Sequence, residues 1–180
     1  MSKQSISKAI ELGRIWMKKS VNIGHDYIHA GNVEKRALQI FQKLNNKSKL
    51  NNTFDEDSVI LVSWWHDAYK SRKVRPSIWG VIFEGNESAK ITRNEIGEYI
   101  EEGQLDKILS AIRWHNHPFL FFLFQKKRNL LGRILIEADG EEALRDERLQ
   151  KQVVSTKHRS DKLGYILINW WKRFQLRLYK

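Results

Sequence analysis

Apolar residues recur along most of the chain at spacings of three and four, which is the periodicity of amphipathic α-helices. Two prolines and ten glycines leave few points at which such helices would break. The pattern therefore predicts an all-α fold, a single-domain helical bundle over residues 1–180. The expected helices cover about residues 5–19, 29–44, 53–69, 92–103, 105–114, 130–150 and 162–178.

Local motifs predict where some of these helices begin. Two Thr-x-x-Glu capping boxes, at residues 53–56 and 92–95, predict helix starts. The helix after the first box is apolar on most sides, so we expect it at the centre of the fold. The basic stretch that begins at Lys70 and the glycines that follow it predict a loop between residues 71 and 84.

Composition narrows the classes of protein and of partner. The chain has 180 residues, 41% of them hydrophobic and 29% charged, which is typical of a globular protein and excludes a disordered or collagen-like one. It has no Cys, so any metal ligands must be nitrogen or oxygen atoms. With 32 Lys and Arg against 21 Asp and Glu, the net charge of +11 favours anionic partners such as nucleotides, nucleic acid or acidic lipid headgroups.

The sequence also bears on the compartment. Residues 1–7 lack the apolar stretch of a secretory signal. The longest apolar run, residues 119–124, is far shorter than the roughly 18 residues that a membrane-spanning helix needs. We therefore expect a cytoplasmic protein without a transmembrane segment.

The pair His66-Asp67 is the first candidate for chemistry. It lies in the apolar run from Val59 to Tyr69, where an imidazole and a carboxylate would be buried together. Burying both groups is costly unless something compensates them, and a divalent cation would do so. Such an ion needs further nitrogen and oxygen ligands from other helices.

Two other stretches complete a pattern around this pair. In residues 24–37, His29 is followed three and four residues on by a polar residue and Val, and residues 136–144 contain an acid and Ala before an Asp. Together with His66-Asp67, these stretches resemble the HD-domain metal-dependent phosphohydrolases, over about residues 20–145. The chain departs from this family at Asn32, where members often carry Arg.

The resemblance implies an HD-type fold that holds one divalent ion. Its ligands would be His29, His66, Asp67 and Asp139, with His25 the less favoured choice for the first position and Glu137 the alternative for the last. Two imidazoles and two carboxylates leave open octahedral positions, which suit Mn, Fe, Co, Ni or Mg better than a closed structural Zn site. A second ion is compatible with the pattern.

The resemblance also implies the reaction, which is hydrolysis of a nucleotide or another phosphate ester by metal-activated water. Asp67 would orient the water as well as bind the ion, and Glu84 lies in a segment that resembles the one in which family members place an acid for the water. His115 would balance the growing negative charge, or bind a second ion or the substrate phosphate, although a helix-end histidine bonded to backbone carbonyls explains it equally well. The expected contacts to the anionic substrate are Lys70, Arg72, Lys73, Arg75 and His117, although a solvated charged loop explains the four basic residues equally well.

Two other functions fit the same residues. One is an HD-fold protein that binds nucleotide or RNA without turning it over, and the other is a di-iron oxygenase of the same fold. The basic, aromatic stretch over residues 170–180, in the C-terminal helix expected within 160–180, suits single-stranded nucleic acid or a membrane surface. A last helix that packs Trp170 and Trp171 on the core explains this stretch as well.

Overall fold

Helices make up nearly all of the regular structure in the computed structural model, which describes residues 3–22, 24–46, 54–73, 78–115, 129–143 and 170. Two short 3-10 helices, η1 (Lys70–Arg72) and η2 (Gly97–Tyr99), join longer elements. The α-helices in the described residues are α1 (Lys3–Lys18), α2 (Tyr27–Asn45), α3 (Glu56–Trp65), α4 (Ile78–Ile96), α5 (Glu102–Trp114) and α7 (Leu130–Ala143). The all-α class expected from the sequence is confirmed.

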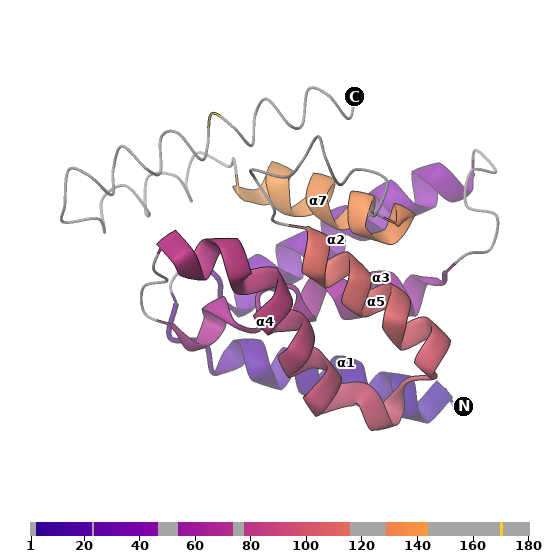
Figure 1. Cartoon of the computed structure of the whole chain (residues 1–180). Helices are drawn as coiled ribbons and strands as arrows, with labels where there is room; N and C mark the ends of the chain where they lie inside the picture. The colour runs from indigo at the N-terminus through magenta and orange to yellow at the C-terminus, as the bar shows by residue number, and fades with distance from the viewer. Residues whose placement is uncertain are drawn as a thin grey trace.

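Helix α3 lies at the centre of this arrangement, as its apolar sequence predicts. It packs against α1, α2, α5 and α7, and all four surround it in Figure 1. From Ser58 to Trp65 every residue except Ile60 is buried. The two residues that follow α3, His66 and Asp67, are buried as well.

The start of α3 differs from the expected capping box. The N-cap is Asp55, whose Oδ1 accepts hydrogen bonds from the backbone N–H of Ser58 at 2.9 Å and from its hydroxyl at 2.6 Å. Gln104 of α5 donates to the same carboxylate oxygen at 3.1 Å. Thr53, the residue expected at this position, lies outside the described residues. Asp55 therefore both caps α3 and links it to α5.

Replacing Asp55 with alanine is expected to lower the free energy of unfolding by about 1 to 2 kcal/mol. The substitution leaves the amide of Ser58 without its acceptor and removes the link to Gln104. Urea unfolding followed by circular dichroism measures the loss, with the neighbouring substitution Glu56→Ala as a control. Equal stability of the two variants would contradict the assignment of Asp55 as the N-cap.

Helix α4 occupies a region where the sequence predicted a loop. The expected loop over residues 71–84 is wrong from Ile78 onward, because α4 begins there. The expected helix start at Thr92 is wrong as well, since Thr92 lies inside α4 and its hydroxyl donates to the carbonyl of Ser88 at 2.7 Å. Glu84, Ser88 and Thr92, spaced by four residues, form a buried polar stripe along α4.

Gly85 of α4 lies directly against the backbone of α5. A Cβ atom on Gly85 would lie 2.3 Å from the carbonyl oxygen of Arg113 and 3.1 Å from that of Ile112. No side chain fits at these distances without moving backbone. The glycine that suggested a loop is therefore a packing requirement of the helix pair α4 and α5.

The later part of the chain is described only in part. Helix α7 begins at Leu130 as expected, and the predicted continuation to residue 150 lies outside the described residues beyond Ala143. The same holds for the predicted helix over residues 162–178, apart from Trp170, which is helical and 64% exposed. Its indole is therefore not packed into the core. None of the helices in the described ranges is long and apolar enough to cross a membrane.

Candidate metal centre

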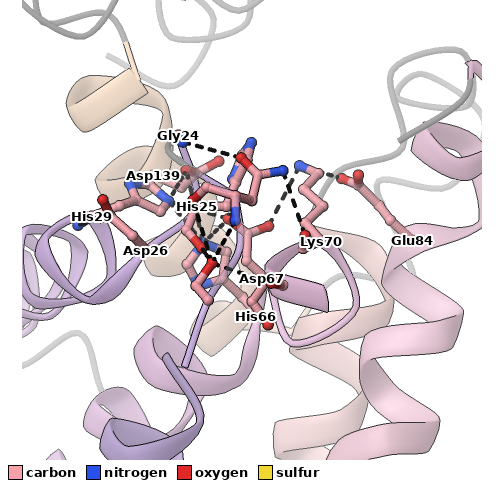
Figure 2. A network of polar contacts seen from close by, with 12 residues as sticks. Gly24, His25, Asp26, His29, His66, Asp67, Lys70, Glu84 and Asp139 are labelled. Atoms are coloured by element: carbon pink, nitrogen blue, oxygen red, sulfur yellow. Dashed lines mark hydrogen bonds and ion pairs between the residues drawn. The ribbon is translucent and has the colours of Figure 1, made fainter. Parts of the chain in front are cut away.

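The structure brings the four residues predicted as metal ligands together in the interior (Figure 2). His29 lies in the first turn of α2, and His66 is the C-cap of α3 with Asp67 directly after it. Asp139 comes from α7, where Glu137, the alternative acid, is only partly buried. The exposed fractions of His29, His66, Asp67 and Asp139 are 3%, 1%, 2% and 6%.

One donor atom from each of these residues faces a common point. His29 Nε2 lies 3.3 Å from His66 Nε2, 3.2 Å from Asp67 Oδ2 and 3.4 Å from Asp139 Oδ1. His66 Nε2 lies 3.2 Å and 3.9 Å from the same two carboxylate oxygens. Ligand atoms about 2.1 Å from a shared ion lie about 3.0 Å apart at right angles and about 4.2 Å apart in trans. The spacing therefore fits His29, His66 and Asp139 as ligands of one cation, with Asp67 Oδ2 at 3.2 Å from the Nε2 atoms of both histidines.

Hydrogen bonds on the far side of both imidazoles fix their orientation. His29 Nδ1 donates to Glu142 Oε2 at 2.7 Å, and His66 Nδ1 donates to the carbonyl of Ser63 at 2.9 Å. In a neutral imidazole, a proton on Nδ1 leaves a lone pair on Nε2. Both lone pairs thus point at the same space, which is the arrangement that outer partners impose on metal-binding histidines.

Glu142 is a site residue that the sequence analysis missed. Its second oxygen accepts a hydrogen bond from Asn32 Nδ2 at 3.2 Å, so Asn32, the departure from the HD pattern, supports the acid that orients His29. A signal was present in the sequence, because Glu142 follows Asp139 by three residues and so lies on the same face of the helix.

His25 also lies beside the ligands, although it was the less favoured choice for the first position. Its Nδ1 is 2.5 Å from Asp67 Oδ2, and its ring meets that of His29 edge to face. His25 precedes α2 in the chain, and the next residue, Asp26, is the N-cap of that helix and accepts from the amide of His29 at 3.0 Å. The short segment before α2 thus positions two of the clustered histidines.

Lys70, expected on a basic loop beside the metal site, lies in the interior. It belongs to η1, and its Nζ is 2.8 Å from Glu84 Oε1 and 3.4 Å from Asp67 Oδ1. Burial alone would lower the pKa of Lys70, but the carboxylates of Asp67, Glu84 and Asp139 outweigh it and raise the pKa above its usual range. Lys70 therefore carries a buried positive charge next to the clustered donors.

The same neighbours determine the charge of Asp67. Burial alone would raise the pKa of its carboxyl group, but His25, His66 and Lys70 outweigh burial and hold the pKa well below its usual range. Asp67 is therefore an anion in the folded protein, which is the form that binds a cation. Glu84, predicted to orient the attacking water, is buried in α4 and has Lys70 as its ion-pair partner.

His115 ends α5 with its ring against that of His66, at 5.2 Å between centroids. Its Nδ1 donates to the carbonyl of Ile112 at 2.6 Å, and its Nε2 is buried without a hydrogen-bond partner among the described residues. Burial, together with the neighbouring His66, lowers the pKa of His115 to about 3. A neutral His115 thus directs a lone pair toward His66 and Asp67, and these three residues form a further candidate set of ligands.

Of the four remaining residues predicted to contact the substrate, the structure describes two, Arg72 and Lys73, and both are exposed. Arg72 is exposed and stacks on the ring of Trp16, with its guanidinium carbon 3.8 Å from the ring centre. Lys73 is exposed near the ring of Tyr69. Arg75 and His117 lie outside the described residues.

No known family model, no curated protein and no solved structure matches the sequence or the fold.

Proposed function

We propose that this protein is a metal-dependent phosphohydrolase of the HD type that acts on a nucleotide or another phosphate ester. The observation that carries the proposal is the convergence of two imidazole lone pairs, from His29 and His66, with carboxylate oxygens of Asp67 and Asp139 at 3.2 to 3.9 Å. The order of these residues along the chain follows the HD pattern. The geometry of the cluster and the order of the residues along the chain thus support the proposal through the same four side chains.

The donor set suits a divalent ion with open coordination positions. Neutral imidazoles and carboxylates bind Mn, Fe, Co, Ni, Mg or Zn, and four protein ligands leave positions for water and substrate in an octahedral ion. When bound, the ion supplies a Lewis acid that lowers the pKa of water and polarises a phosphoryl oxygen. Glu142 and the carbonyl of Ser63 keep the imidazoles in the tautomer that such a site requires.

The other polar residues have distinct roles in this proposal. Lys70 offsets the charge of Asp67 and Glu84 and, with His115, lies close enough to the ligands to face a bound phosphate group. Arg72, Lys73, Arg75 and His117 attract the anionic substrate. Glu84 acts mainly through Lys70, because its carboxylate forms an ion pair with that ammonium group.

A second candidate function is a di-iron oxygenase. It is favoured by the overlapping donor sets, because His66, Asp67 and His115 form one group and His25, His29 and Asp67 form another. Two ions per chain, both iron, would support this function over hydrolysis by a single ion.

Metal analysis followed by a phosphatase screen tests the main proposal. Purified full-length protein is analysed for metal content, freed of metal with chelator, and assayed against nucleoside mono- and triphosphates and cyclic dinucleotides with and without Mn²⁺. We expect phosphate release that depends on the metal and tolerates moderate salt. Binding of RNA that weakens steeply with salt, without any turnover, would instead support a nucleic-acid-binding protein.

Removal of metal is also expected to lower thermal stability. A ligand that binds only the folded state adds about 2.7 kcal/mol when its concentration is 100 times its Kd. Differential scanning fluorimetry with EDTA and then with excess Mn²⁺ measures the change in Tm, with His66→Asn as the control that should show no response. A wild-type Tm that is indifferent to every divalent ion would count against a metal site.

A further inference from the structure

The carboxylate of Asp67 is held at both of its oxygen atoms. His25 Nδ1 lies 2.5 Å from Oδ2, and Lys70 Nζ lies 3.4 Å from Oδ1 (Figure 2). Oδ2 is the same atom that faces His29 Nε2 and His66 Nε2 at 3.2 Å. The contact with His25 therefore bears directly on the atom that is aimed at the ion.

The contact between His25 Nδ1 and Asp67 Oδ2 fits a hydrogen bond better than shared coordination of one ion. Two ligands of one ion, each about 2.1 Å from it and at right angles, lie about 3.0 Å apart. His25 Nδ1 and Asp67 Oδ2 are closer than this, whereas the other donor pairs lie at 3.2 Å or more. A proton on Nδ1 explains the contact. A carboxylate oxygen can accept this proton with one lone pair and bind a cation with the other.

The backbone around His25 is tied to the segment that carries Asp67. The hydroxyl of Ser20 donates to the carbonyl of His25 at 2.8 Å and reaches the carbonyl of Ser71 at 3.2 Å. The amide of Val21 donates to the carbonyl of Ser71 at 2.9 Å, and Asn22 Nδ2 donates to that of Lys73 at 3.0 Å. Residues 20–22 and the backbone of His25 are thus tied by hydrogen bonds to residues 67–73, which positions His25 relative to Asp67.

We propose that His25 is a positioning residue, whose Nδ1–H holds Asp67 Oδ2 in the direction of His29 and His66 and so raises the affinity of the site for a divalent ion. This inference rests on the metal site of the proposed function, but it does not depend on which reaction that site performs. Outer partners of metal ligands typically contribute 10- to 100-fold to affinity.

Three substitutions at His25 separate positioning from the alternatives. Asparagine carries its amide nitrogen where histidine carries Nδ1, glutamine carries it one bond farther out, and alanine has no donor. The dissociation constant for Mn²⁺ is measured on each full-length variant by electron paramagnetic resonance of the free ion. We expect His25→Ala and His25→Gln to bind Mn²⁺ about 10- to 100-fold more weakly than wild type, and His25→Asn to recover most of the affinity.

Each outcome bears on the inference. Wild-type affinity in His25→Ala would overturn it, as would a loss in His25→Asn equal to that in alanine, which would identify His25 as a ligand. Absence of any binding by the wild type would also overturn it. The Tm of each variant without metal shows whether the fold is kept, and a merely structural role would lower this Tm without rescue of affinity by asparagine. Tight Mn²⁺ binding without hydrolysis of any phosphate ester would reject the proposed function and leave the role of His25 in place.

Discussion

Replacing His66 with alanine or asparagine is expected to abolish metal uptake and, with it, hydrolysis. His66 Nε2 lies within 3.9 Å of donor atoms from His29, Asp67 and Asp139, so it faces every other ligand of the proposed site. Loss of an outer partner alone weakens binding by about 10- to 100-fold, and loss of a ligand should exceed that. Asparagine is the more informative change, because its amide can still donate to the carbonyl of Ser63 and so preserve the end of α3.

The measurements are metal content after purification, the Kd for Mn²⁺ and the rate of phosphate release. Asp55→Ala is a matched control, since it lowers stability far from the cluster and should keep both metal and activity below its Tm. An unchanged rate in either His66 variant would show that the catalytic assignment is wrong.

Replacing Gly85 with alanine is expected to lower the free energy of unfolding by about 3 kcal/mol, at the upper end of the usual cost of overpacking. The added Cβ would lie 2.3 Å from the carbonyl oxygen and 3.0 Å from the carbonyl carbon of Arg113. These are backbone atoms that cannot rotate away, so α4 and α5 must separate. The neighbouring carbonyl of Ile112 accepts from His115 Nδ1, and separation would therefore disturb that histidine too.

Gly31→Ala is the control for this prediction. Gly31 also lies inside a helix, but a Cβ there would meet only side-chain atoms of Trp64 at 3.8 Å or more. Alanine should be neutral at this position or stabilise by up to about 1 kcal/mol, because glycine is a poor helix former. Urea unfolding of both variants measures the contrast. Equal stabilities would show that α4 and α5 tolerate a side chain at Gly85.

Helices with a single buried face could be predicted from the sequence, because their periodicity is local. Helices α1, α2 and α5 appear close to the expected ranges, and the central position of α3 followed from its lack of a polar face. Helix α4 was missed because the role of Gly85 depends on the backbone of α5, which no local pattern reveals. The motif at Thr92 was misleading for a related reason, since its hydroxyl bonds back to Ser88 inside the helix.

In the candidate site, too, the residues with a recognisable sequence pattern were predicted, and those that depend on contacts between distant segments were not. His29, His66, Asp67 and Asp139 were predicted as ligands from their order along the chain, and the structure places a donor atom of each of the other three within 3.9 Å of His66 Nε2. The contacts that orient these side chains and balance their charge were not predicted. The contact between His25 and Asp67 depends on hydrogen bonds between two loops, and the burial of Lys70 depends on Glu84 from a helix that the sequence analysis did not predict.

The distance along the chain between the clustered residues has a consequence for the order of folding. His29 contacts Asp139 and Glu142, more than one hundred residues later, so the cluster is incomplete until α7 has docked on α2. Contacts of such long range form late, since the entropy of closing the intervening chain must first be overcome. A bound ion would then slow unfolding more than it speeds folding, and a nascent chain that lacks α7 would lack both Asp139 and the acid that orients His29.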